Sequence, residues 1–167
     1  IQNGTVTVGK WIKTIYEILV NGLKSGKWDF DEEKANKAIN FIENFCHHSE
    51  GRNDLLKLEL WQKAIVSAIF GIMDKRTGYR QFREVFIVVA RKNGKTLFAA
   101  AIAAYMAYID GEYGAKVYFL APKLDQADLV YDAFYQIVQA DDELDSITKK
   151  RRSDIYINCL LYTSPSP

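Results

Sequence analysis

The stretch that decides the fold is "VFIVVARKNGKTLFAAAIAAYMAYI", residues 85–109. It opens with a short, mostly β-branched run that lacks alternation, which is typical of a strand buried on both faces. It closes with an alanine-rich run that is apolar nearly all round and favours a helix covered on most sides. The sequence therefore predicts a strand over 85–90, a basic loop, and a helix over 95–109.

A loop between a strand and a helix presents free backbone N–H groups and the positive end of the helix dipole to an anion. Gly94 lets the backbone approach a phosphate oxygen, Lys95 can reach between the β- and γ-phosphates, and the Thr96 hydroxyl can ligate magnesium. These residues are the last three positions of the phosphate-loop motif G-x-x-x-x-G-K-[ST]. Val89 stands where that motif has its first glycine.

Asn93-Gly94 is also a strong signal for a two-residue hairpin between strands. A hairpin needs a strand next, whereas the residues after Gly94 favour a helix, so the phosphate loop is the preferred interpretation. Arg91 and Lys92 add positive charge beside the loop. Either is plain surface charge, or one of them senses the γ-phosphate.

The rest of the chain predicts an α/β fold. Apolar periodicity indicates helices over 10–23, 29–48 with an Asp29 cap, 58–73 and 124–138, a buried strand over 116–121 and a third strand beginning at 155–159. The order strand, helix, strand, helix from residue 85 onward predicts parallel strands joined by a right-handed crossover.

Composition and charge exclude several classes of protein. A net charge of +1 argues against an overall electrostatic attraction to nucleic acid. The spacing typical of a disulfide framework or a zinc site is not found among Cys46, Cys159 and the adjacent His47 and His48. This favours a reducing, intracellular setting. No apolar run reaches the length of about 18 residues that a membrane span needs, so we expect a soluble, unprocessed protein without a membrane partner.

Two glutamines are candidates for binding roles. Gln62, in "LELWQKAI", carries an amide that could read the edge of adenine, although the residue taken alone favours an ordinary surface glutamine. Gln126 lies at the head of the predicted helix over 124–138, where Asp125 could act as an ordinary cap.

Five segments resemble, in order, the amino-terminal part of the ATPase domain of tailed-bacteriophage large terminases. They are "GKWIKTIYEIL", "FDEEKANKAINFIENF", "LKLELWQKAIVSAIFGI", "FREVFIVVARKNGKT" and "KVYFLAPKLDQADLVYDAF". Terminases of this subfamily carry a phosphate loop without its first glycine, so Val89 fits the resemblance.

The resemblance implies a helicase-like P-loop fold, a parallel sheet flanked by helices, that binds ATP and Mg²⁺. It implies catalytic roles for Arg91 and Lys95, a metal-binding role for Thr96, and adenine recognition by Gln62. Gln126 would be a coupling residue. The implied nucleotide-binding set is Gln62, Arg91, Lys92, Asn93, Gly94, Lys95 and Thr96.

By the same resemblance, the protein is part of a motor that hydrolyses ATP to move double-stranded DNA into a procapsid. A carboxyl-terminal domain would supply the endonuclease, and the partners would be the portal protein and the small terminase subunit. The intact protein is expected to form a ring on the procapsid in the host cytoplasm. The alternatives are a nucleotide-binding interaction module or another P-loop ATPase or helicase-like protein; a small-molecule kinase is disfavoured because its loop begins with glycine.

The expected organisation is a helical amino-terminal region over 1–54, a partial ATPase domain over 55–158 and an unrelated tail over 159–167. A hydrolytic P-loop motor also needs a strand ending in Asp-Glu. Asp141, Asp142 and Glu143 follow a helix and do not qualify, and neither a trans-acting arginine nor nuclease residues are found. We therefore expect a piece of a longer reading frame that is inactive by itself.

Overall fold

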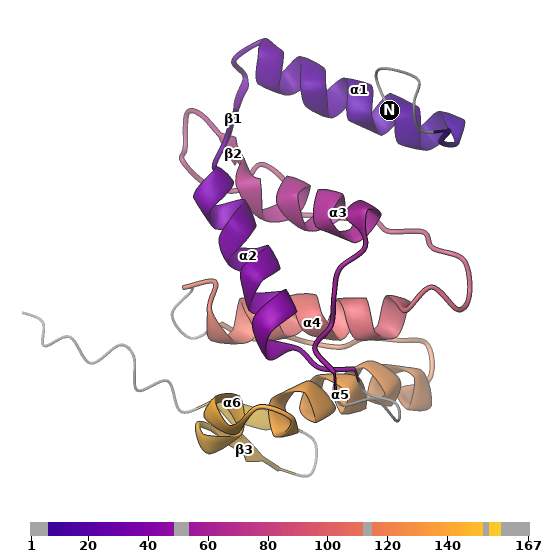
Figure 1. The fold of residues 1–167 in the computed structure, drawn as a ribbon, viewed down its shortest axis with the longest axis vertical. Coiled ribbons are helices and arrows are strands. Elements are labelled where there is room, and N and C mark those ends of the chain that lie inside the picture. Colours follow the sequence, from indigo (N-terminus) through magenta and orange to yellow (C-terminus); the bar gives the residue numbers. More distant parts are fainter. Residues whose placement is uncertain (1–6, 49–53, 112–114, 152–153, 158–167) are drawn as a thin grey trace, which may run out of the picture.

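The computed structural model describes residues 7–48, 54–111, 115–151 and 154–157. Within these ranges helices predominate, and α3, α4 and α5 are stacked while α2 crosses beside them (Figure 1). The helices are α1 (Lys10–Lys24), α2 (Glu32–Phe45), α3 (Leu60–Gly71), α4 (Lys95–Tyr108), α5 (Leu124–Gln139) and α6 (Asp142–Ser146). The strands are β1 (Trp28–Phe30), β2 (Ile72–Asp74), β3 (Thr148–Lys150) and β4 (Ile155–Ile157).

The alanine-rich helix α4 is the centre of the core, as its composition predicts. Seven of its residues are buried, and it packs against α5 and α2. Tyr105 contacts the ring of Phe70 from α3 at a centroid distance of 4.7 Å and that of Phe41 from α2 at 5.9 Å. One hydrophobic cluster thus joins residues on both sides of position 54.

Helices are confirmed within the predicted ranges 10–23, 29–48, 58–73 and 124–138, although residues 72–73 belong to β2, and the predicted cap Asp29 is wrong. Asp29 lies in β1, which pairs antiparallel with β2, so α2 begins later and its cap is Asp31. The Asp31 carboxylate accepts the backbone N–H of Lys34 at 3.0 Å. At α5 the N-cap position is Lys123, and Asp125 lies within the first turn.

The predicted strands over 85–90 and 116–121 are wrong in this structure: both segments are extended but neither is assigned as a strand. A strand exists through a hydrogen-bonded neighbour about 4.8 Å away, and these segments instead border a cavity. Several of their apolar side chains are consequently open to solvent, with Phe86 93% and Leu120 92% exposed. The pairings observed are antiparallel, β1 with β2 and β3 with β4.

The helices nevertheless keep the arrangement that a strand–helix–strand–helix order predicts. Both extended segments run toward the same side of the molecule, and there α4 and α5 begin (Figure 1). The two helices pack along each other. The start of α4 therefore lies near the start of α5.

The third predicted strand is confirmed over Ile155–Ile157, although it forms a hairpin with β3 and joins no parallel sheet. The hairpin is tied to the core by Thr148, whose hydroxyl lies 2.6 Å from the Tyr108 hydroxyl. Cys159 and the expected tail over 159–167 lie outside the described residues.

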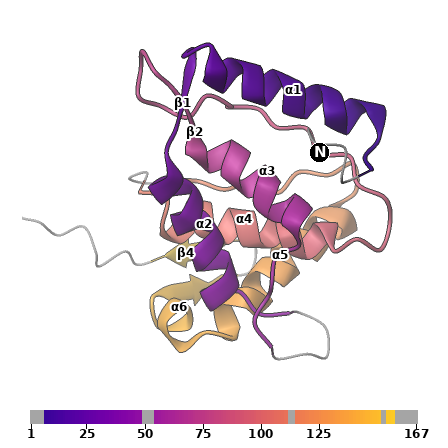
Figure 2. The same cartoon turned by 45° about the horizontal axis from the view of Figure 1, so that its top comes forward.

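The remaining features concern α1, Cys46 and the two histidines. Helix α1 lies at the margin of the fold and contributes no buried residue (Figures 1 and 2). Burial, together with the charge of Asp141, raises the pKa of the Cys46 thiol to about 12, so this side chain stays a protonated core residue. His47 and His48 follow α2, and no group of metal-binding side chains occurs in the described ranges. None of the helices in these ranges has both the length and the hydropathy needed to span a bilayer.

Candidate functional site

The loop before α4 has an unusual backbone. Lys92 has φ = 67° and is the one non-glycine residue with positive φ in the described part of the chain. Gly94, the N-cap of α4, is also left-handed, with φ = 63° and ψ = 22°. A left-handed lysine costs about 1–2 kcal/mol, and strain of this kind collects at functional sites. Left-handed residues in such turns gather backbone N–H groups into a concave, anion-binding arrangement.

Asn93 fixes the shape of this loop. Its side-chain Nδ2 donates to the backbone carbonyls of Ala90 and Arg91, both at 3.3 Å. These two carbonyl oxygens are thereby engaged inside the turn. They do not compete with an anion for the backbone N–H groups that follow Gly94. The backbone N–H of Phe98 donates to the Gly94 carbonyl at 2.9 Å, which starts α4 and excludes the hairpin alternative.

Lys95 and Thr96 are the first two residues of α4 and line the same cavity. The Lys95 ammonium has no hydrogen-bond or ion-pair partner in the described residues, and its side chain is exposed. The backbone N–H groups of this first turn have no acceptor within the helix. A cation, a hydroxyl and free N–H groups at the positive end of a helix form an anion site.

The cavity has a volume of about 1300 Å³ and lies between the extended segments over 85–89 and 120–121. Its floor is mainly apolar and comes from α4, with Ile102 and Met106 among the lining residues. The polar side chains around it belong to Tyr79, Arg80, Arg83, Lys95, Thr96 and Gln126. No carboxylate lines it, so the charge of the described lining favours an anionic ligand.

Comparisons with known proteins agree with this geometry. A family model described as "Terminase large subunit, ATPase domain" matches residues 60–160, more than half of the chain. The chain belongs to this terminase family. Its matched range contains the loop, α4, α5 and the cavity described above.

A solved structure shares the fold of this terminase ATPase chain. The crystal structure of the HK97 bacteriophage large terminase aligns with a TM-score of 0.62 and 23% identity, over 72% of this chain and 24% of that one. The chain thus spans about a quarter of the length of that protein. No curated protein sequence gives a significant match.

Gln62 does not lie at the surface of the terminase chain; it is 7% exposed. Its Oε1 accepts the backbone N–H of Glu59 at 2.8 Å, and the Glu59 side chain accepts a backbone N–H in return. This capping box starts α3. The preceding residue, Trp61, contacts Phe98 of α4 at a ring-centroid distance of 5.8 Å, so the start of α3 lies against the helix that carries the loop. Gln62 itself does not line the cavity.

Arg91 and Lys92 are exposed and, like Asn93 and Gly94, do not line the cavity. The structure therefore brings Lys95 and Thr96 together with Gln126, and leaves the remaining predicted residues around the rim of the loop or on α3. The roles of all these residues in binding nucleotide stay predictions.

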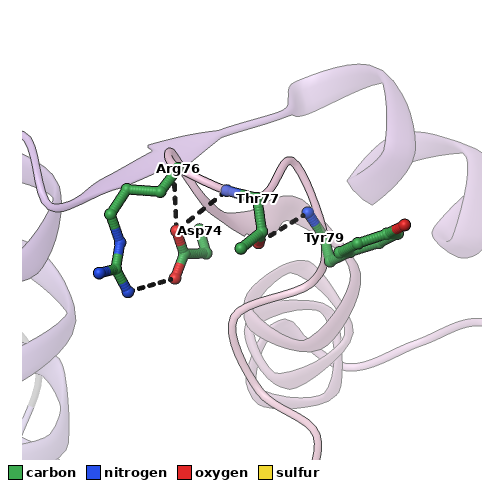
Figure 3. A network of polar contacts seen from close by, with 4 residues as sticks. All are labelled: Asp74, Arg76, Thr77 and Tyr79. Atoms are coloured by element: carbon green, nitrogen blue, oxygen red, sulfur yellow. Dashed lines mark hydrogen bonds and ion pairs between the residues drawn. The ribbon is translucent and has the colours of Figure 1, made fainter.

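Sequence reasoning missed Arg80, which was part of an unremarkable turn. Its guanidinium pairs with Asp110 at 2.9 Å and lies over the Phe70 ring at 5.4 Å. The preceding turn is built on Asp74, which accepts the backbone N–H groups of Arg76 and Thr77 at 2.8 and 3.3 Å (Figure 3). The Arg76 N–H bond is the main reason that the pKa of Asp74 is lowered.

The same turn continues through Thr77, whose hydroxyl accepts the backbone N–H of Tyr79 at 3.3 Å (Figure 3). Tyr79 and Arg80 are thereby set at the cavity. A carboxylate that caps its own turn is a local signal, but the pairing of Arg80 with Asp110 joins residues thirty positions apart and gives no sequence signal.

Proposed function

We propose that this chain is the nucleotide-binding part of a viral DNA-packaging motor that binds and hydrolyses ATP. The observation that carries the proposal is the loop: Lys92 and Gly94 are left-handed, the Asn93 amide holds the turn, and Lys95, which follows directly, has no partner among the described residues. Membership of the terminase ATPase family supplies the reaction class.

Each residue of the loop has a distinct role in this proposal. The N–H groups that follow Gly94 hold the inner phosphates, and Lys95 neutralises charge between the β- and γ-phosphates. Arg91 assists at the γ-phosphate, and Lys92 and Asn93 keep the loop in its binding shape. Thr96 would hold Mg²⁺ through its hydroxyl; the ion, when bound, neutralises phosphate charge.

Adenine recognition is assigned to Gln62. Because its Oε1 already accepts the Glu59 N–H, only the Nε2 group is free to donate to an acceptor on the base. A contact with both edges of the amide would use the second lone pair of Oε1 beside the capping-box hydrogen bond.

We also propose that hydrolysis needs residues beyond this chain. Among the described residues no carboxylate lines the cavity, whereas orientation of the attacking water and completion of the magnesium shell require an Asp-Glu pair. We expect the extended segments over 85–90 and 116–121 to become strands of a parallel sheet when further strands of the ATPase domain pair with them. The 167 residues alone would then bind nucleotide without turning it over.

In the whole protein, the nucleotide cycle would drive double-stranded DNA into the procapsid. The partners in this proposal are the portal protein and the small terminase subunit, in a ring that acts in the host cytoplasm. An endonuclease would lie in a further domain. The second candidate, a nucleotide-binding interaction module, is also consistent with a described cavity lining that lacks carboxylates, and it predicts no turnover by the full-length protein.

The deciding experiment compares phosphate release by the full-length protein with and without double-stranded DNA, alongside the Lys95→Ala variant. DNA-stimulated hydrolysis that Lys95→Ala abolishes is the expected result. Nucleotide binding without turnover in the full-length protein would favour the interaction module. No nucleotide binding in either form would contradict the assignment of the loop.

A further inference from the structure

Gln126 lies where a second helix begins beside the loop helix. It is in the first turn of α5, and its side chain is exposed. Its backbone N–H donates to the Lys123 carbonyl at 3.1 Å, while its side-chain amide has no hydrogen-bond partner among the described residues. It also does not cap the helix, because the N-cap position is Lys123. The Gln126 amide is therefore free to bind a ligand.

The cavity connects Gln126 to the loop. Gln126 lines it together with Lys95 and Thr96, and α4 and α5 begin on the same side of the molecule (Figure 1). A nucleotide whose inner phosphates lie on the N–H groups after Gly94 would extend its terminal phosphate away from the loop. The start of α5, which includes Gln126, forms the neighbouring wall of the same cavity.

We propose that Gln126 donates a hydrogen bond from Nε2 to the terminal phosphate of a bound nucleoside triphosphate, and so distinguishes the triphosphate from the diphosphate. The inference rests on the proposed function of the loop. An amide suits this task because it donates a hydrogen bond without adding charge. It therefore adds little to the affinity for the inner phosphates, and that affinity comes from the positive charge of Lys95. Its free Oε1 remains available to accept a hydrogen bond from a water molecule beside that phosphate.

The charge of the surroundings supports an anion at this place. Arg83 lines the same cavity and has no ion-pair partner in the described parts of the chain. Arg80 is also present but is paired with Asp110. No carboxylate among the described lining residues opposes a phosphate group.

The test measures the affinity of the 167-residue chain for ATP and for ADP, with Mg²⁺ present, by titration calorimetry or displacement of a fluorescent nucleotide. Gln126→Ala should weaken ATP binding about tenfold, the effect of losing one hydrogen bond to a charged group, and leave ADP affinity unchanged. Gln126→Glu should weaken ATP further by repulsion. Gln136→Ala, which removes an exposed glutamine farther along the same helix, is the matched control and should alter neither affinity.

The outcomes separate this inference from the proposed function. If the unmodified chain binds both nucleotides and Lys95→Ala loses both, the loop stands; an unchanged ATP affinity in Gln126→Ala, or equal losses of ATP and ADP, then overturns the role of Gln126 alone. If the unmodified chain binds neither nucleotide, both proposals are overturned. Far-ultraviolet circular dichroism and thermal melting establish that each variant is folded, and Gln126→Asn, which keeps the amide but shortens its reach, should show the same selective loss of ATP.

Discussion

The Lys63 ammonium lies 2.9 Å from the Glu43 carboxylate and thereby joins α3 to α2. The same carboxylate accepts the backbone N–H of Leu58 at 3.0 Å, just before α3 begins. Lys57 adds a third link, because its Nζ donates to the Glu43 carbonyl at 3.2 Å. Glu43 is thus the polar connection between the amino-terminal helices and the segment that carries Gln62.

This arrangement predicts a specific loss of stability in acid. Desolvation raises the pKa of Glu43, but hydrogen bonds from Lys63 and Leu58 outweigh it and hold the pKa below its ordinary value of 4.5. A carboxyl group whose pKa is lower in the folded state stabilises the fold above its unfolded pKa, and the stabilisation disappears as the pH falls through the folded pKa. The free energy of unfolding should therefore decline below about pH 4.5.

Glu43→Gln should reduce the free energy of unfolding by about 1–2 kcal/mol at pH 7 and flatten the decline below pH 4.5. Urea denaturation between pH 3 and pH 7 measures both effects. Glu17→Gln, an exposed carboxylate on α1, is the control and should keep the wild-type pH profile. An acid limb of unchanged slope in Glu43→Gln would contradict the linkage.

The left-handed backbone of Lys92 predicts opposite effects for two substitutions. Lys92→Gly removes the steric cost of φ = 67° and should leave stability unchanged or raise it by up to about 1 kcal/mol, because glycine also loses more entropy on folding. Lys92→Val, with a β-branched side chain, should lower stability by at least about 1 kcal/mol. Thermal melts of the two variants give the comparison, and equal melting temperatures would show that the loop does not hold this conformation in solution.

Lys95→Ala should separate binding from folding. The side chain is exposed and unpartnered within the described residues, so the melting temperature should stay close to that of the unmodified chain. Affinity for ATP and for ADP should fall by about 10- to 100-fold, since a charged donor to phosphate is lost. Lys37→Ala, on the exposed face of α2, should leave affinity intact; a comparable loss in that variant would indicate a general effect of charge.

Gln62→Ala should have two effects, and a neighbouring residue tells them apart. Loss of the capping box should lower the free energy of unfolding by about 1 kcal/mol. Loss of the base contact should weaken the binding of ATP more than the binding of inorganic triphosphate. Glu59→Ala removes the other half of the same capping box. It should match the stability loss while preserving the ratio of the two affinities, and if both variants shift that ratio equally, Gln62 is only a cap.

The exposed apolar segments predict self-association of the isolated chain. Phe86 is 93% and Tyr118 72% exposed, each on an extended segment without strand partners. Large exposed apolar side chains on unpaired extended backbone promote aggregation. Phe86→Lys and Tyr118→Lys should shift the chain toward monomer in sedimentation experiments without lowering its melting temperature, whereas an unmodified chain that stays monomeric at high concentration would refute the expectation.

The sequence predicted the helices well because their signal is local. The apolar periodicity of α2 and α5 and the alanine content of α4 are contained within one segment each. The strands predicted over 85–90 and 116–121 do not form in this structure, for the complementary reason: apolar, β-branched composition shows what a segment could do, but pairing depends on a neighbour elsewhere in the chain. The cap of α2 was predicted at Asp29 and not at Asp31 because the sequence does not show that Asp29 belongs to β1. That strand pairs with residues more than forty positions away.

The candidate site was partly predictable on the same grounds. Gly94, Lys95 and Thr96 follow a short motif, and the structure places them at the start of α4 as that motif predicts. The sequence did not indicate that Asn93 closes the loop through two carbonyls, nor that Gln62 belongs to a capping box, since glutamate is not a preferred N-cap residue. The approach of Gln126 to the same cavity depends on the packing of α4 against α5 and has no local signal.

The two hydrogen bonds of the Asn93 amide also bear on the time course of binding. These bonds hold the bent loop through contacts within the chain itself, so the entropy of ordering it is expected to be lost during folding and not during association. A ligand then meets a surface that needs no rearrangement, and capture should be a single, fast kinetic phase whose rate rises in proportion to nucleotide concentration. Affinity differences among nucleotides would accordingly lie in how long each one stays bound.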